Sequence, residues 1–309
     1  MKLAISLATR NRAPQLLQTI NAVVSCLALD NTVLMIQVDA DDPVTIQALT
    51  FTPLDRRIKV NIAPREDTIA AKWNRVLCEP ADVYLVAADD DPVITPQADV
   101  KILEAAKLLP PDGVGIVYGH LVNSSFASIV GVTAQMAEMM GYLQPELFPY
   151  WFCDHWTDDI ARMIDRLVFA DVKTDQSKAA KTMEMREPGW WATWFDASFS
   201  MREDAARRII ESPNFDLPDW SNYRERLLRN FPLVRYRSRW INQAVRNTSA
   251  NLESWSGLSN KDDRYQRVKQ RAIDMLPQLL AAMPPEEAKV YAQALNPPAQ
   301  IVNLPRLYA

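Results

Sequence analysis

Three consecutive aspartates, Asp89, Asp90 and Asp91, directly follow an apolar run at 83–88 that has the length of a buried strand. Adjacent carboxylates repel one another, and a hard divalent cation together with a substrate phosphate relieves that repulsion. One interpretation of the triplet is therefore a metal and nucleotide site. The alternative is a polar loop before a helix, because the Thr-Pro pair at 95–96 has the residue types of a helix start. The triplet alone does not decide between these interpretations.

Apolar runs alternate with helical patterns along the first ninety residues, and these elements must position the aspartates. The pattern predicts strands at 3–8, 33–38, 58–62 and 83–88 and helices at 14–28 and 67–78. Such alternation is typical of an α/β domain with a mostly parallel sheet, whose ligands bind at the carboxyl ends of the strands. Three of the predicted strands end in polar residues, so we expect these ends to meet in one crevice.

Glycine-rich phosphate-binding turns do not occur in this sequence. The chain has seven glycines in 309 residues, and neither a dinucleotide fingerprint nor a P-loop lysine motif follows the first strand. Phosphate would then be held by a metal ion, arginine or lysine. This favours the metal interpretation of the aspartate triplet.

The composition narrows the class of protein. Apolar residues make up 48% of the chain, and the formal net charge of -4 argues against a protein that is basic overall. Three widely spaced cysteines indicate neither a disulfide framework nor a thiolate zinc site. We expect a cytoplasmic protein without a membrane anchor, because the first apolar stretch is short and no run has the length of a membrane span.

The polar strand ends resemble a known family. The matching segments are Ile-Ser-Leu-Ala-Thr-Arg-Asn-Arg at 5–12, Val-Asp at 38–39, Ala-Lys-Trp-Asn at 71–74, and the aspartate triplet with Pro96 after it. Their order and spacing resemble the family 2 glycosyltransferases of the GT-A fold over about the first 120 residues. The resemblance implies a nucleotide-diphospho-sugar donor, a UDP-sugar before others, a Mn²⁺ or Mg²⁺ ion, and transfer of the sugar to an acceptor hydroxyl.

We therefore expect an α/β fold: a GT-A-like, Rossmann-type nucleotide-diphospho-sugar transferase domain with a mostly parallel central sheet and a helical C-terminal extension. The catalytic domain is expected over 1–200, with a donor-binding half at 1–120 and an acceptor half with a loop at 121–200. The helical extension is expected over 201–309. A capping box at 200–203 predicts a helix start near residue 201. Amphipathic helices are predicted over 262–295, with a break at Pro284-Pro285.

The resemblance also implies roles for residues of the donor half. Asp89 and Asp91 match the outer positions of the DXD motif, with Asp91 the expected direct metal ligand. The expected donor-binding set is Thr9, Arg10, Arg12, Asp39, Asp41, Arg65, Asn74, Asp89 and Asp90. The sequence departs from the family at 39–42, where the Gly-Ser that usually follows the aspartates is missing, so the donor base stays open. Asp42 has a second interpretation as the cap of a helix that starts at Pro43.

A second acidic cluster, Asp-His-Trp-Thr-Asp-Asp, lies at 154–159. An inverting transfer needs a group that takes the proton of the acceptor hydroxyl. The resemblance places this base at Asp158, with Asp159 second, and His155 is a candidate third metal ligand. The alternative is structural, because Thr157 has the type of an N-cap and acids in a first turn complement the helix dipole. The neighbouring aromatic residues at 151, 152 and 156 either form a sugar-binding wall or belong to the core.

Residues 173–191 have the composition of a loop that ends in Trp190 and Trp191. Such a loop would act as a lid over the donor phosphate, or it is a plain surface loop. Both tryptophans are expected to contact the acceptor or a phosphate.

Arginines and aromatic residues interleave over 223–246, where seven arginines are opposed by the single acid Glu225. Arginine favours bidentate phosphate contacts and stacking. Arg235, Arg237 and Arg239 are therefore expected to contact an acceptor or its phosphates. A hydroxymethylated base in DNA, which some phage glycosyltransferases modify, is one candidate acceptor. The alternative is a helix pair whose arginines pair with acidic residues of this chain or of another subunit.

The sequence thus predicts a metal-dependent, inverting, hexosyltransferase-like glycosyltransferase. One rival is a nucleotidyltransferase of similar α/β fold, which usually needs a glycine-rich, lysine-containing loop that this chain lacks. The other rival is a non-catalytic protein that binds nucleic acid or phosphate through residues 223–246. The intact aspartate triplet argues against it.

Overall fold

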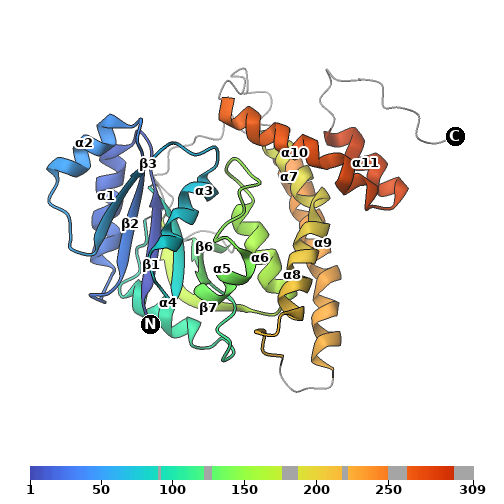
Figure 1. Cartoon of the computed structure of the whole chain (residues 1–309), viewed down its shortest axis with the longest axis horizontal. Coiled ribbons are helices and arrows are strands. Elements are labelled where there is room, and N and C mark those ends of the chain that lie inside the picture. Colours follow the sequence, from blue (N-terminus) through green and yellow to red (C-terminus); the bar gives the residue numbers. More distant parts are fainter. Residues whose placement is uncertain (90–91, 122–126, 176–186, 218–221, 250–262, 296–309) are drawn as a thin grey trace.

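The computed structural model describes residues 1–89, 92–121, 127–175, 187–217, 222–249 and 263–295. These residues form an α/β part around one sheet and a part made of long helices beside it (Figure 1). Asp90, Asp91 and residues 176–186 of the predicted lid lie outside the described residues.

A seven-stranded sheet with the order β3-β2-β1-β4-β6-β5-β7 forms the centre of the α/β part. Its strands are β1 (Leu3–Ala8), β2 (Val33–Asp39), β3 (Ile58–Ala63), β4 (Val83–Ala88), β5 (Ile116–Leu121), β6 (Ala127–Thr133) and β7 (Leu167–Thr174). β6 runs antiparallel to both of its neighbours, and the other pairs are parallel. The predicted α/β fold with a mostly parallel sheet is confirmed.

The central strands are mostly apolar because both faces of the sheet are covered. Every residue of β1 and β2 is buried. Successive side chains point to opposite faces, so Leu3, Ile5 and Leu7 belong to one core cluster and Ala4 to another. The first cluster includes side chains of α1 (Ala13–Ser25), α2 (Pro43–Phe51) and α4 (Ala98–Ala106).

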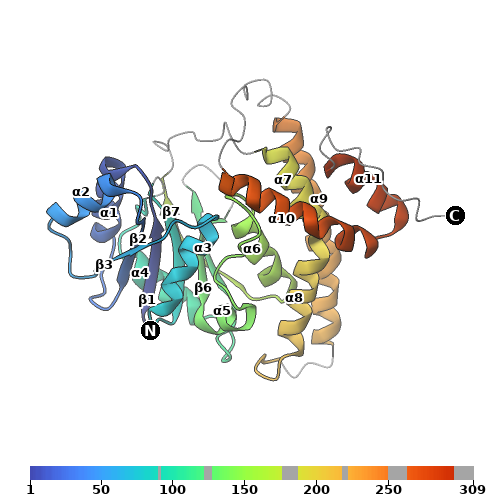
Figure 2. The ribbon, with the colours of Figure 1, turned by 45° about the horizontal axis from the view of Figure 1, so that its top comes forward.

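The opposite face carries α3 (Ile69–Asn74), α5 (Ala134–Met140) and α6 (Cys153–Met163), and its core continues into the long helices. These are α7 (Pro188–Ala197), α8 (Phe199–Glu211), α9 (Tyr223–Ser249), α10 (Asp263–Ala281) and α11 (Pro285–Leu295). α10 reaches back towards α3 (Figure 2), where Arg267 and Arg271 pair with Asp67 at 2.6 and 3.4 Å. No helix of the described chain is long and apolar enough to cross a membrane.

Several predicted elements differ in extent. The helix predicted at 67–78 is α3 followed by a 3-10 turn at Arg75–Cys78. α8 begins at Phe199 rather than near residue 201, and the capping hydrogen bond predicted for Ser200 is not formed, because the helix has already started before this residue. The predicted break between α10 and α11 at Pro284-Pro285 is confirmed. The boundary at residue 200 stays a prediction, and α7, which precedes it, packs against α9 and α11.

The alternative interpretation of 223–246 is wrong in one part, because the segment is not a helix pair but a single helix of 27 residues, α9. The pairing of its arginines with acidic residues of this chain is confirmed, since Arg237 pairs with Asp158 and Asp159 of α6. Pro232 lies inside it and is exposed. A proline in a helix removes one backbone hydrogen bond and crowds the preceding turn. The buried residues Leu227, Phe231, Val234 and Ile241 on either side hold the two halves on the same core.

Candidate functional site

The carboxyl ends of β1, β2 and β4 meet at one edge of the sheet, as expected for adjacent parallel strands. Ala8 at the end of β1 pairs with Gln37 of β2 and with Ala88 of β4. The next residue of β1, Thr9, therefore lies beside Asp89, and its hydroxyl donates a hydrogen bond to Asp89 Oδ2 at 2.8 Å. The strand register thus brings together side chains that are 80 residues apart in the sequence.

Asp89 is buried and held at three points. Besides Thr9, Arg12 Nη1 donates to Asp89 Oδ1 at 3.0 Å, and the hydroxyl of Thr19 donates to the Asp89 backbone oxygen at 2.6 Å. Arg12 neutralises the carboxylate, which could not otherwise be buried without a large desolvation cost. The first aspartate of the triplet is therefore fixed in orientation, and with it the chain that enters residues 90 and 91.

The second acidic position, Asp39, is also nearly inaccessible and is paired with two cations. Arg10 Nη1 lies 3.1 Å from Asp39 Oδ2, and Lys72 Nζ lies 2.8 Å from Asp39 Oδ1. Lys72 also donates to the Thr9 backbone oxygen at 2.9 Å, so it ties β1 to β2. Burial lowers the pKa of Lys72, and the interaction with Asp39 opposes that shift.

Arg10 also binds the exposed Asp41, whose two carboxylate oxygens lie 2.5 and 3.1 Å from its guanidinium. These hydrogen bonds lower the pKa of Asp41 and raise that of Arg10, and the charge of Arg65 adds to the effect on Asp41. The expected base and ribose region is therefore a network of ion pairs. A donor that binds there must insert its hydroxyls and phosphates among charges that already have partners.

The structure supports the second interpretation of Asp42, as a helix cap. It is the N-cap of α2, where its Oδ1 accepts from the Thr45 backbone N–H at 3.1 Å. Its Oδ2 accepts from the Asn11 backbone N–H at 2.6 Å. Asn11 has a φ of 53°, so Asp42 stabilises a strained turn between β1 and α1.

Asn74, expected at the floor of the donor pocket, lies at the end of α3 and holds another segment. Its Oδ1 accepts from the backbone N–H groups of Leu143 and Gln144 at 3.0 and 2.8 Å, and its Nδ2 donates to the Gln144 backbone oxygen at 2.9 Å. Asn74 therefore connects the donor half with the segment before α6. A contact of Asn74 with the donor stays a prediction.

The described residues alone do not make a metal site. Among them, no three His, Cys, Asp or Glu side chains are grouped closely enough to hold an ion. Asp89 contributes one carboxylate with Arg12 already beside it, and the other two aspartates of the triplet lie outside the described residues. Metal binding therefore stays a prediction that depends on Asp91.

The acidic cluster at 154–159 lies within α6, which begins at Cys153. The predicted N-cap role of Thr157 is wrong, because this residue is in the second turn and its hydroxyl donates to Gln144 Oε1 at 3.0 Å. Phe152 and Trp156 are buried in the core, so the helix starts early enough to bury both rings. Of the predicted aromatic wall, these two residues form core instead.

Asp158 is almost fully buried, and its two carboxylate oxygens differ. Oδ2 accepts from Arg162 Nε at 2.9 Å and from Arg237 Nη2 at 2.6 Å. Oδ1 is inaccessible to solvent and has no hydrogen-bond partner among the described residues. A buried acceptor without a donor is costly, which marks this oxygen as a place for a ligand hydroxyl.

Asp159 is enclosed completely. Its Oδ1 accepts from Arg237 Nη1, and its Oδ2 lies 3.1 Å from Nε of Arg202, a fully buried residue of α8. Burial raises the pKa of Asp159, and the two arginines oppose that shift. Burial also lowers the pKa of Arg202 to about 10. Through these two arginines, Asp159 connects α6 with α8 and α9.

His155 pairs with its neighbour Asp154, with 2.9 Å between Nδ1 and Oδ1, and its ring contacts those of Phe152 and Phe195. Burial alone would lower the pKa of His155, but the Asp154 carboxylate outweighs burial and raises it. A metal role for His155 stays a prediction.

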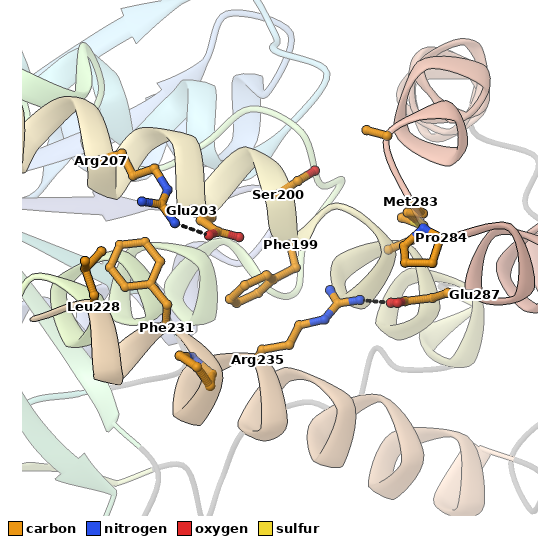
Figure 3. Close-up of a pocket in the computed structure, with 13 residues that line it drawn as sticks. Phe199, Ser200, Glu203, Arg207, Leu228, Phe231, Arg235, Met283, Pro284 and Glu287 are labelled. Atoms are coloured by element: carbon orange, nitrogen blue, oxygen red, sulfur yellow. Dashed lines mark hydrogen bonds and ion pairs between the residues drawn. The ribbon is translucent and has the colours of Figure 1, made fainter. Parts of the chain in front are cut away.

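The arginines expected to contact the acceptor make internal contacts. Arg235 pairs with Glu287 of α11 and donates to the Asp196 backbone oxygen at 2.9 Å, and Arg239 pairs with Glu287 at 3.0 Å. Figure 3 shows Arg235 crossing a groove of about 620 Å³ between Phe199 of α8 and Glu287. This groove lies among the long helices and includes neither Asp89 nor Asp158.

The predicted loop over 173–191 is shorter than expected, because β7 extends to Thr174 and α7 begins at Pro188. Trp191 is therefore a core residue, and its Nε1 donates to the Tyr265 hydroxyl at 2.8 Å. Trp190 Nε1 donates to the Leu295 backbone oxygen at 3.1 Å. Through these hydrogen bonds the two tryptophans connect α7 with α10 and α11.

Sequence reasoning did not single out three cations of the site: Lys72, Arg162 and Arg202. Arg162 could have been found from the sequence, because it lies four residues after Asp158 on the same helix. Arg202 gives no local signal, because its partner Asp159 is more than forty residues away.

No protein family model and no curated protein sequence matches this chain. Two solved structures share its fold at low identity. The mannosyltransferase PcManGT from Pyrobaculum calidifontis, in complex with GDP-Man and Mn²⁺, is 12% identical with a TM-score of 0.51, over 95% of this chain and 85% of that one. Residues 1–349 of TarS from S. aureus, in complex with UDP-GlcNAc, are 11% identical with a TM-score of 0.51, over 95% and 87%. The fold is that of GT-A glycosyltransferases.

Proposed function

We propose that this protein is a metal-dependent, inverting glycosyltransferase that moves a hexose from a nucleotide-diphospho-sugar to an acceptor hydroxyl. The observation that carries the proposal is the meeting of Thr9, Asp39 and Asp89 at the carboxyl ends of adjacent parallel strands. In an open α/β sheet, ligands bind at these ends. The two structurally similar proteins are described as complexes with a sugar nucleotide, GDP-Man in one and UDP-GlcNAc in the other.

The donor half supplies both charges that a sugar nucleotide needs. Carboxylates such as Asp39 accept hydrogen bonds from ribose hydroxyls or base N–H groups, and Arg10, Arg12 and Lys72 offer cations for a diphosphate. A bound Mn²⁺ or Mg²⁺, held by Asp91 with Asp89 beside it, would neutralise charge on the leaving diphosphate. A UDP-sugar is the proposed donor.

The acceptor half supplies the base. In an inverting transfer, the acceptor oxygen forms a bond to the anomeric carbon while the bond to the diphosphate breaks and its electron pair leaves with the diphosphate oxygen. The hydroxyl proton goes to a carboxylate. Asp158 is the proposed base, because its Oδ1 is a buried acceptor whose partner is missing among the described residues.

The proposed acceptor is a hydroxymethylated base in DNA. Of the arginine-rich segment, Arg235 and Arg237 face inward, whereas Arg229, Tyr236 and Trp240 are exposed on the outer side of α9. Arginines that meet phosphates and aromatic rings that stack on bases are the usual means of binding single-stranded nucleic acid.

The donor and metal proposal is tested by release of nucleoside diphosphate from UDP- and GDP-sugars with Mn²⁺. We expect the wild type to turn over one sugar nucleotide and Asp91→Asn to lose about 100-fold or more of that activity with an unchanged melting temperature. Asp204→Asn, an exposed acid on α8, is the matched control and should keep full activity. Equal turnover by Asp91→Asn and the wild type would sink the metal assignment, and a wild type that binds and turns over no sugar nucleotide would overturn the function.

A further inference from the structure

The acid pair on α6 is surrounded by arginines from three helices. Arg162 comes from α6 itself, Arg202 from α8 and Arg237 from α9. Two carboxylates side by side in a buried place repel each other, and burial makes that repulsion stronger. Three guanidinium groups compensate for it, and the C-terminal helices supply two of them.

Arg237 is the arginine that touches both acids. Its Nη2 donates to Asp158 Oδ2 at 2.6 Å, and its Nη1 donates to Asp159 Oδ1. A guanidinium is planar and its donors have fixed directions, so fixing one nitrogen fixes the other. Asp159 is itself held by the buried Arg202. Asp159 therefore fixes the position of Arg237, and Arg237 in turn fixes the position of Asp158.

The contacts of Asp158 are one-sided. Both arginines bind Oδ2, which leaves Oδ1 buried and without a hydrogen-bond partner in the described part of the chain. Two charge-assisted hydrogen bonds to one oxygen prevent the carboxylate from turning over. Oδ1 is thus held as the free acceptor.

We propose that Arg237 is a positioning residue: it fixes Asp158 Oδ2 so that Oδ1 takes the proton of the acceptor hydroxyl. This inference rests on the proposed function, in which Asp158 is the base. It differs from the phosphate contact that the sequence predicts for Arg237, because the guanidinium is bound to two acids of α6. The C-terminal helices then take part in the reaction through this one side chain.

The test uses the full-length protein and the sugar nucleotide that it turns over, with hydrolysis of the donor as the reaction when no acceptor is added. In Arg237→Gln we expect kcat to fall about 100-fold, because a misplaced catalytic group loses that much. The KM for the donor should stay within about twofold. Arg237→Lys keeps the charge and can still donate a hydrogen bond to Asp158, so it should recover part of kcat.

Two further variants separate this role from a loss of folding. Arg162→Gln removes the other contact to Asp158 Oδ2 and leaves Asp159 untouched, so it should lower kcat by a smaller factor, again with the donor KM within about twofold. Arg207→Gln removes an arginine paired with Glu203 on α8 at 2.6 Å and should change neither kcat nor KM. If Arg237→Gln does not fold, the kcat and KM of Arg162→Gln decide.

A raised donor KM with unchanged kcat in Arg237→Gln would make Arg237 a phosphate contact and overturn the inference while the glycosyltransferase function stands. An unchanged kcat in both Arg237→Gln and Arg162→Gln would also overturn it. A wild type without any turnover of sugar nucleotides refutes the proposed function instead, and the inference falls with it.

Discussion

At the residue scale, adjacent aspartates of the same type have different environments. Asp158 has one oxygen bound to two partly exposed arginines and one oxygen without a hydrogen-bond partner among the described residues. Asp159 has both oxygens against arginines and no exposure at all. A proton acceptor needs an oxygen without a hydrogen-bond partner, whereas the oxygens of a buried ion pair are already bound. The geometry therefore makes Asp158 the candidate base and Asp159 a residue that stabilises the fold.

This difference predicts opposite outcomes for two conservative variants. Asp158→Asn should lower kcat by about 100-fold or more, since the amide cannot take the proton, and should change stability little, because its arginines reach solvent. Asp159→Asn should lower the free energy of unfolding by about 3–5 kcal/mol, because Arg202 stays buried without its counter-charge. Urea unfolding and nucleoside diphosphate release measure the two effects. Asp159→Asn with full stability and no activity would reverse the assignment.

At the element scale, the sheet and the helix start at Asp42-Pro43 could be predicted, but the starts of α6 and α8 could not. β1, β2 and β4 are almost continuous apolar runs that end in polar residues, which is what two covered faces require. The start of α6 depends on burial of Phe152 and Trp156 against helices far along the chain, so Thr157 gave a false cap signal. Likewise, contacts such as Arg237 with Asp158 join residues 79 positions apart. Only the tertiary fold creates them.

Pro232 is the clearest conflict between local sequence and tertiary structure in α9. Proline inside a helix costs about 3 kcal/mol relative to alanine, and here packing of the helix on the core offsets that cost. Pro232→Ala should therefore raise the free energy of unfolding, by about 1–3 kcal/mol, because the side chain is exposed and leaves no cavity. Urea unfolding checks this, with Pro43→Ala at the start of α2 as a control that should bring no such gain. A destabilised Pro232→Ala would show that the helix geometry at this point requires proline.

At the scale of the whole molecule, the long helices continue the core of the sheet on the α6 side. The face of α9 that meets α6 carries Arg237 to the acid pair. The opposite face lies on the side of the molecule away from α1 and α2 (Figure 1), with Leu233, Tyr236 and Trp240 exposed at 68, 73 and 50%. Their spacing of three and four residues places them on one face of the helix. An acceptor polymer on this face would lie one helix width from the proposed base.

If that polymer is DNA, binding must combine charge and stacking. We expect a single-stranded oligonucleotide with hydroxymethylated bases to bind with an affinity that falls with salt, and Arg229→Gln to reduce the salt slope by about one. Tyr236→Ala should weaken binding by about 1–3 kcal/mol, as loss of a stacked base does. Fluorescence anisotropy at several salt concentrations measures both. Phe51→Ala, an aromatic exposed at 78% on α2, is the matched control and should bind like the wild type. An affinity that depends neither on salt nor on the two α9 variants would rule out DNA as the acceptor. The donor proposal would stand, because the proposed sugar-nucleotide site lies at the strand ends and not on α9.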